Sequence, residues 1–106
     1  METSITARHC EIPDALRERA TTVVQRIGNL AARPMETAVV FDADGSRRTV
    51  ELRLHVARGE VFVAKGEGPD HRTALDRAET RLKRQVSKAF GRSRRGRHSQ
   101  TSVKQV

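Results

Sequence analysis

The sequence predicts an α+β domain in the order β-α-β-β-β-α, with two helices packed on one face of a four-stranded sheet. Three patterns favour this fold: two segments with apolar residues at threes and fours, three β-rich segments with short turns between them, and a strand-like start. The chain has 106 residues, enough for one modest core. We expect a domain over residues 1–91 and a basic, flexible tail over residues 92–106.

The first strand is expected over residues 4–8, with its apolar side chains on one face. Pro13 and Asp14 then begin a helix, because proline suits the first turn and an acid there favours the helix dipole. We expect Gly28 to weaken the last turn and Pro34 to end the helix at the latest. Its apolar stripe comprises Ala15, Leu16, Ala20, Val23, Val24, Ile27, Leu30 and Ala31.

Three further strands are expected over residues 37–42, 48–57 and 61–65. The turns at 44–45 and 58–59 are too short for a parallel crossover, so these strands form an antiparallel meander. In the middle strand apolar and polar residues alternate, and the apolar set is Val50, Leu52, Leu54 and Val56.

Gly66, Gly68 and Pro69 are expected to stop the sheet, and Asp70 to cap the final helix. The buried seam of that helix is expected to comprise Leu75, Ala78, Leu82, Val86 and Ala89. Beyond residue 90 no apolar period remains, so we expect disorder there in the unbound protein.

The C-terminal third holds the whole charge surplus. Residues 1–69 contain ten basic and ten acidic residues, and residues 70–106 contain eleven and three, so 11 − 3 accounts for the net +8. This asymmetry favours a polyanionic partner.

Four cations of the final helix, Arg77, Arg81, Arg84 and Lys88, are spaced four, three and four apart. This spacing places them on one face, roughly opposite the apolar seam, where they can meet several phosphates of an RNA strand. Arg92 and Arg95 can extend the row. The alternative is a solvated face, but such a face would normally interleave acidic residues. Only Asp76 and Glu79 do so here.

The chain has no Trp or Tyr, and its three Phe residues fit the core. Single-strand readers stack bases on exposed rings, so this composition favours structured RNA read through backbone and shape. His9 beside Cys10 lacks the second pair of a zinc site, and the glycines at 66 and 68 lack the context of a phosphate loop. We therefore expect no catalytic site, metal or cofactor.

The sequence has no transmembrane segment or secretory signal, and a single cysteine fits a reducing compartment. We expect a cytoplasmic protein, monomeric when unbound, with no membrane partner and no small-molecule substrate.

Several motifs in register resemble the bacterial ribosome hibernation promoting factors, also called ribosome-associated translation inhibitors. The resemblance covers about residues 4–90, and its motifs lie at residues 5–9, 11–17, 54–60, 70–76 and 81–88. It implies a fold similar to double-stranded-RNA-binding domains. It also implies binding to the small ribosomal subunit and its ribosomal RNA, in the channel for messenger and transfer RNA, and inhibition of translation by occupancy.

The family's basic residues map onto Arg81, Arg84 and Lys88, and less closely onto Arg17 and Arg26 of the first helix. Two departures stand out. His71 and Arg72 replace a usual Met-Tyr pair, and Lys83 occupies a position that is often acidic in relatives. The RNA-binding residues are therefore expected to be Arg77, Arg81, Lys83, Arg84, Lys88, Arg17, Arg26, Arg92 and Arg95.

The resemblance implies a short form without the second domain that pairs ribosomes, and whether it promotes or opposes pairing stays open. Two rival functions also stay open. One is a general structured-RNA-binding module without ribosome preference. The other is an interaction factor whose basic tail docks on an acidic protein such as a transcription factor. An enzyme is the remotest reading, because no convergent catalytic set exists.

Overall fold

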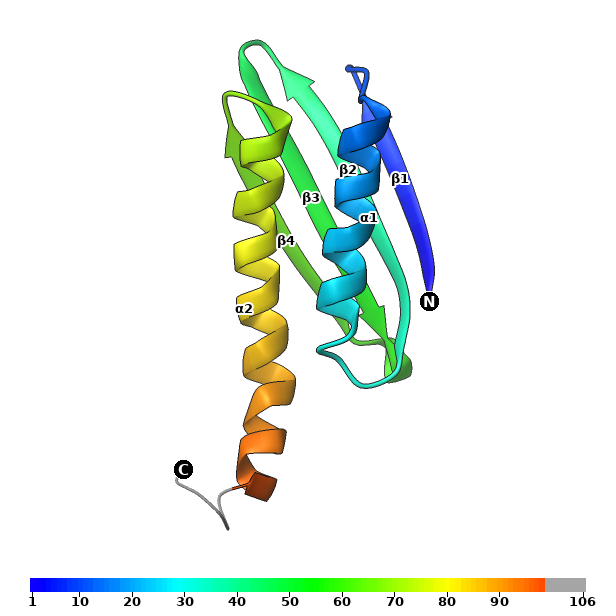
Figure 1. Ribbon diagram of the computed structural model, residues 1–106, viewed down its shortest axis with the longest axis vertical. Helices are drawn as coiled ribbons and strands as arrows, with labels where there is room; N and C mark the ends of the chain where they lie inside the picture. Colours follow the sequence, from blue (N-terminus) through cyan, green and yellow to red (C-terminus); the bar gives the residue numbers. More distant parts are fainter. Residues whose placement is uncertain (99–106) are drawn as a thin grey trace.

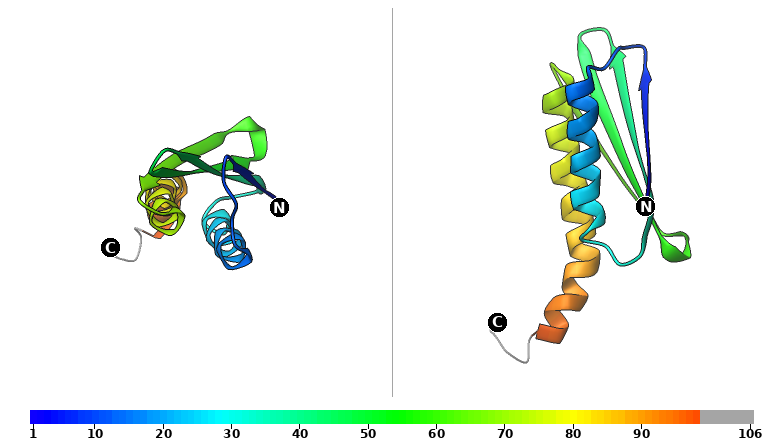
Figure 2. Two further views of the ribbon diagram at one scale, coloured as in Figure 1. Left: turned by 90° about the horizontal axis from the view of Figure 1, so that it is seen from above. Right: turned by 45° about the vertical axis from the view of Figure 1, so that its right-hand side comes forward.

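The computed structural model describes residues 1–98, with side chains through residue 91, and confirms the α+β class. Both helices lie on one face of the sheet, and the other face is uncovered (Figures 1 and 2). The elements in chain order are β1 (Glu2–Arg8), α1 (Asp14–Gly28), β2 (Pro34–Asp44), β3 (Arg47–Val56), a 3₁₀ turn (Ala57–Gly59), β4 (Val61–Gly68) and α2 (His71–His98).

The strands are ordered β1-β2-β3-β4 across the sheet. β1 pairs with β2 in parallel, since α1 carries the chain back between them. β2, β3 and β4 form the predicted antiparallel meander, and β2 and β4 extend beyond their expected ends. β4 therefore lies at one edge of the sheet with a single strand neighbour, and this position matters for the site.

The core lies between the sheet and the two helices. It includes most of the apolar residues predicted for α1, β3 and α2. Ala15 and Ala89 are exposed rather than buried. Leu30 and Ala31 follow the end of α1 and pack against the core from the loop.

The expectation that Gly66 stops the sheet is wrong. Gly66 lies inside β4, at a close approach of α2. A Cβ at this position would lie 2.1 Å from the carbonyl oxygen of Ala74 and 2.5 Å from the amide nitrogen of Ala78. The missing side chain therefore lets the helix backbone approach the strand closely.

The predicted cap of α2 is confirmed, because the backbone N–H of Thr73 donates to Oδ1 of Asp70 at 2.7 Å. This hydrogen bond is the main reason why the pKa of Asp70 lies below its usual value. The α2 backbone continues to His98, so the domain boundary expected at residue 91 falls inside the helix. Residues 99–106 of the expected tail lie outside the described residues. No helix in the described part is long and apolar enough to cross a membrane.

Candidate nucleic-acid interface

The basic row of α2 faces the edge of β4 and not, as the sequence suggested, the side opposite the seam. Nη1 of Arg77 donates to the carbonyl oxygen of Glu67 at 2.7 Å. Nη1 of Arg81 donates to the backbone carbonyl oxygen of Lys65. The row lies about a third of a turn from the seam, and β4 is the outermost strand on that side. The four cations thus lie along one side of α2, as their spacing predicted, but this side borders β4 and is not opposite the seam.

Gln85 completes a regular series with these two arginines, since its Nε2 donates to the carbonyl oxygen of Val63 at 2.9 Å. The three helix residues are four positions apart, and the three strand carbonyls are two positions apart. Four helical residues rise about 6.0 Å and two strand residues about 6.6 Å, so the repeats match. We call this set of three hydrogen bonds the edge cap.

The side chains of Arg84 and Lys88, the remaining members of the row, make no hydrogen bond or ion pair within the described part of the chain, and both are exposed. They line a shallow groove between α2 and β4 together with Val63, Ala64, Lys65, Arg81 and Gln85. The groove is thus bordered by three basic side chains of the helix and one of the strand. No acidic residue lines it. Lys65 was not among the predicted site residues, because it reads as an ordinary polar strand position in the sequence.

Acidic residues lie on the other flank of α2, toward α1. Asp76 pairs with Arg19 at 2.9 Å, and Glu79 pairs with Arg26 at 3.1 Å. Arg26, a predicted RNA-binding residue, is therefore partly neutralised within the fold. Sequence patterns did not indicate these pairs, because they join residues 53 and 57 positions apart.

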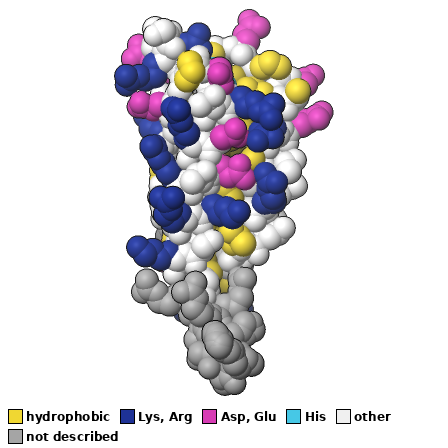
Figure 3. All heavy atoms as spheres, turned by 60° about the vertical axis from the view of Figure 1, so that its left-hand side comes forward, with side chains coloured by type: hydrophobic (Ala, Val, Ile, Leu, Met, Phe, Trp, Pro, Cys, Tyr) yellow, Lys and Arg dark blue, Asp and Glu magenta, His cyan; other side chains and the backbone are white. Residues whose placement is uncertain are grey.

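Two other predicted residues, Arg17 on α1 and Lys83 on α2, are exposed and have no ion-pair partner within the described residues. The side chains of Arg92 and Arg95 lie outside the described part. Seen from the side of α2, lysine and arginine side chains form a column along this helix (Figure 3). Acidic side chains lie mainly beside the column and at the upper end of the molecule in this view.

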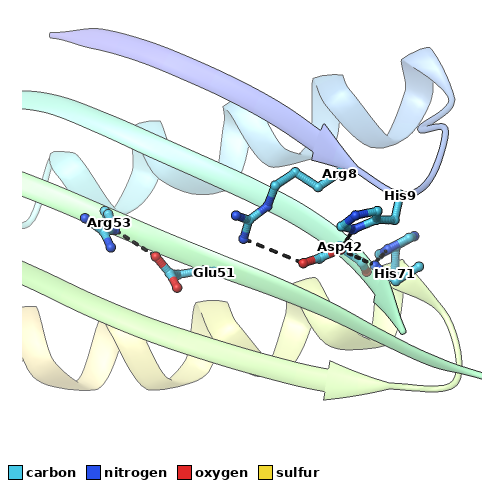
Figure 4. A network of polar contacts seen from close by, with 7 residues as sticks. Arg8, His9, Asp42, Glu51, Arg53 and His71 are labelled. Atoms are coloured by element: carbon cyan, nitrogen blue, oxygen red, sulfur yellow. Dashed lines mark hydrogen bonds and ion pairs between the residues drawn. The ribbon is translucent and has the colours of Figure 1, made fainter. Parts of the chain in front are cut away.

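A separate polar cluster lies where β1 and β2 end (Figure 4). Oδ1 of Asp42 is 3.0 Å from Nδ1 of His9, and Oδ2 of the same residue is 3.6 Å from Arg8. His71 packs edge-on against Phe41 and donates from Nε2 to the carbonyl oxygen of Asp42 at 2.8 Å. His71 thus ties the start of α2 to β2, and the sequence had suggested only a surface role for it.

The hydrogen bond from His9 is the main reason why the pKa of Asp42 lies below its usual value, with help from the Ala43 N–H and the charge of Arg8. No group of three or more metal-ligating side chains occurs among the described residues. On the uncovered sheet face, Glu51 and Arg53 pair with each other at 2.7 Å (Figure 4). This face has paired charges, in contrast to the groove beside α2.

Comparison with known proteins places this arrangement among ribosome-associated proteins. Residues 3–94 match the model of the family described as Sigma 54 modulation protein / S30EA ribosomal protein. The chain is 32% identical to the ribosome hibernation promoting factor of Salmonella typhimurium over 88 residues, which cover 83% of this chain and 92% of that protein. It is 25% identical to the ribosome hibernation promotion factor of Rhizobium meliloti, and spans 46% of that protein's length.

Solved structures that share the fold include the following two. The N-terminal domain of Protein Y from Thermus thermophilus has a TM-score of 0.72 and 26% identity, with 83% of this chain and 98% of that chain covered. A ribosomal subunit interface protein from Coxiella burnetii has a TM-score of 0.73 and 20% identity, with 84% and 97% covered, and this similarity concerns the fold alone.

Proposed function

Because the chain belongs to the family described as Sigma 54 modulation protein / S30EA ribosomal protein, we propose that it is a ribosome hibernation factor of the cytoplasm. It binds the small ribosomal subunit through ribosomal RNA, in the channel that messenger and transfer RNA use. Translation stops because the channel is occupied, and no covalent chemistry takes place.

One observation carries the assignment of the binding face: Arg81, Arg84 and Lys88 border a groove with no acidic lining residue. Arg77 continues the row along the same edge of β4, where it donates to the carbonyl oxygen of Glu67. Basic side chains that neutralise phosphates supply most of the sequence-independent affinity for nucleic acids. No phenylalanine is fully exposed in the described part, which suits recognition of backbone and shape more than of splayed bases.

The face is tested with Arg84→Glu/Lys88→Glu, because neither side chain has a partner within the described fold and the variant should melt like the wild type. We expect affinity for purified small subunits to fall at least about tenfold, and the slope of log affinity against log salt to become shallower by about 1.5. The wild-type slope itself should be about −4 to −5 for four to six neutralised phosphates.

Arg33→Glu/Arg58→Glu is the matched control. It changes the net charge equally, but at two loop positions away from the row. Similar losses in both variants would mean that only net charge matters, and full binding by the first variant would reject the chosen face.

Occupancy of the channel is tested by competition. Saturating protein should prevent small subunits from binding a messenger template and initiator transfer RNA. Normal binding of both ligands would refute the channel assignment. Equal affinity for any long RNA duplex would favour a general RNA-binding module, and failure to sediment with ribosomes would favour a protein-interaction factor.

A further inference from the structure

We propose that the groove between β4 and α2 binds the phosphates of an RNA strand. The edge cap holds two phosphate ligands in position: Arg81, which lines the groove, and Arg77, which lies further along the same edge of β4. This inference rests on the proposed function and assigns different tasks to cations that carry the same charge. Arg77 and Arg81 are positioned phosphate ligands, whereas Arg84, Lys88 and Lys65 contribute charge without a fixed orientation.

The two arginines are held by the strand in a defined geometry. Each guanidinium uses one N–H on a carbonyl of β4, at Glu67 and Lys65. A guanidinium has five N–H donors in a rigid plane, so once one donor is fixed the others point in defined directions. Four donors on each arginine therefore remain for a ligand, already oriented before the ligand arrives.

The bonds to β4 also lower the entropy that the two arginines lose on binding. A long side chain that becomes ordered at an interface costs about 0.5–1.5 kcal/mol. Arg77 and Arg81 have already lost part of this freedom on folding, whereas Arg84 and Lys88 must lose it when RNA binds. Each anchored arginine thus contributes more affinity than an unanchored one of equal charge.

The free edge of β4 presents backbone acceptors and donors beside the groove. The carbonyl groups of Val63, Lys65 and Glu67 accept the edge cap and so point away from β3. In a strand the N–H of a residue points to the same side as its C=O, so the amides of these residues face the same edge. The carbonyl acceptors on this edge are thus occupied by side chains of α2, whereas the amide donors are left for a ligand. An edge with donors but no free acceptors favours an anion and disfavours pairing with a strand of another protein.

The test exchanges arginine for lysine, which preserves charge but replaces the planar fork by a single ammonium group. Arg77→Lys/Arg81→Lys should bind small subunits about tenfold more weakly than the wild type at one salt concentration. Its salt slope should stay unchanged, because the number of charges is the same. The matched control Arg33→Lys/Arg58→Lys also exchanges two arginines, at loop positions that do not line the groove, and should bind like the wild type.

A third variant measures the stability of the edge cap. Gln85→Ala removes its uncharged bond, so the fall in melting temperature reports what one such bond contributes to stability. Wild-type affinity in Arg77→Lys/Arg81→Lys, or an equal loss in the control, would overturn this inference while the proposed function stands. Failure of the wild-type protein to bind small subunits would instead overturn the proposed function.

Discussion

The closest contact between α2 and β4 provides a stringent test of how the fold positions the basic row. Replacing Gly66 by alanine would place a methyl group 2.1 Å from the Ala74 oxygen, about 1.3 Å inside ordinary van der Waals contact at 3.4 Å. The same methyl would lie 2.5 Å from the Ala78 nitrogen. Both atoms belong to the helix backbone, so no side-chain rotation can relieve the clash, and α2 must shift away from β4.

The expected cost follows from these contacts. Overpacking in a core typically costs 1–3 kcal/mol, and a backbone clash belongs at the upper end, about 3 kcal/mol. Alanine recovers roughly 0.5–1 kcal/mol over glycine in regular structure, so about 2 kcal/mol remains. For a domain of this size that corresponds to a fall in melting temperature of roughly 8–16 °C.

Gly91→Ala is the internal control, because an added Cβ there has no atom within 4 Å and the residue is helical. The same chemical change should stabilise the protein by about 0.5–1 kcal/mol. Thermal melts followed by circular dichroism would show opposite shifts in the two variants. A melting temperature of Gly66→Ala within 2 °C or so of the wild type would refute the close-approach argument. A shifted α2 should also break the edge cap, so the surviving folded protein should bind small subunits more weakly.

Three further changes test other parts of the structure. Glu79→Gln removes the partner of Arg26 at 3.1 Å, so RNA affinity should rise and the salt slope should steepen by up to about 0.9, as measured by fluorescence anisotropy; an unchanged slope would contradict the shielding role of Glu79. Arg58→Gly should stabilise the fold by about 0.5–1 kcal/mol in urea melts, because Arg58 has φ 76°, whereas Arg17→Gly inside α1 should destabilise it by about 1 kcal/mol. The pKa of Asp42 and that of Asp70 lie below the usual 3.8 in the folded state, mainly because of hydrogen bonds from His9 and Thr73. Their stabilising contribution is present above the unfolded pKa and is lost as pH falls through the lower folded pKa, so stability should decline below about pH 4. Asp42→Asn/Asp70→Asn should flatten that decline, and an equally steep one would exclude these carboxylates as its cause.

Local patterns were sufficient to predict most of the fold. Alternation in β3 and the three- and four-residue spacing in both helices depend only on which side chains must leave water, and the buried residues follow them closely. The cap at Asp70 is similarly local, since it needs an acceptor three residues before a backbone N–H. The order of the strands was not predicted, because the same alternation suits any neighbour in the sheet.

The site required knowledge of distances between segments. The spacing of the four cations showed that they share one face, but the location of that face depends on where the last strand ends beside α2. Gly66 has the same sequence signal whether it stops a strand or admits a helix, and only packing distinguishes the two cases. The pairing of Arg26 with Glu79 likewise depends on the juxtaposition of two helices far apart in sequence.

The edge cap connects these points to function. An edge strand with unpaired backbone groups invites pairing with another chain, and proteins commonly protect it with charge or with a covering element. Here the covering groups are Arg77 and Arg81, and each uses one guanidinium N–H on a carbonyl of the strand. Protection of the edge and orientation of the phosphate ligands are thus achieved by the same two bonds. A basic row on the side opposite the seam would have no carbonyls within reach, so its arginines would pay the full entropic cost on binding. The flank position therefore supports the proposed binding of an RNA-lined channel in competition with messenger and transfer RNA.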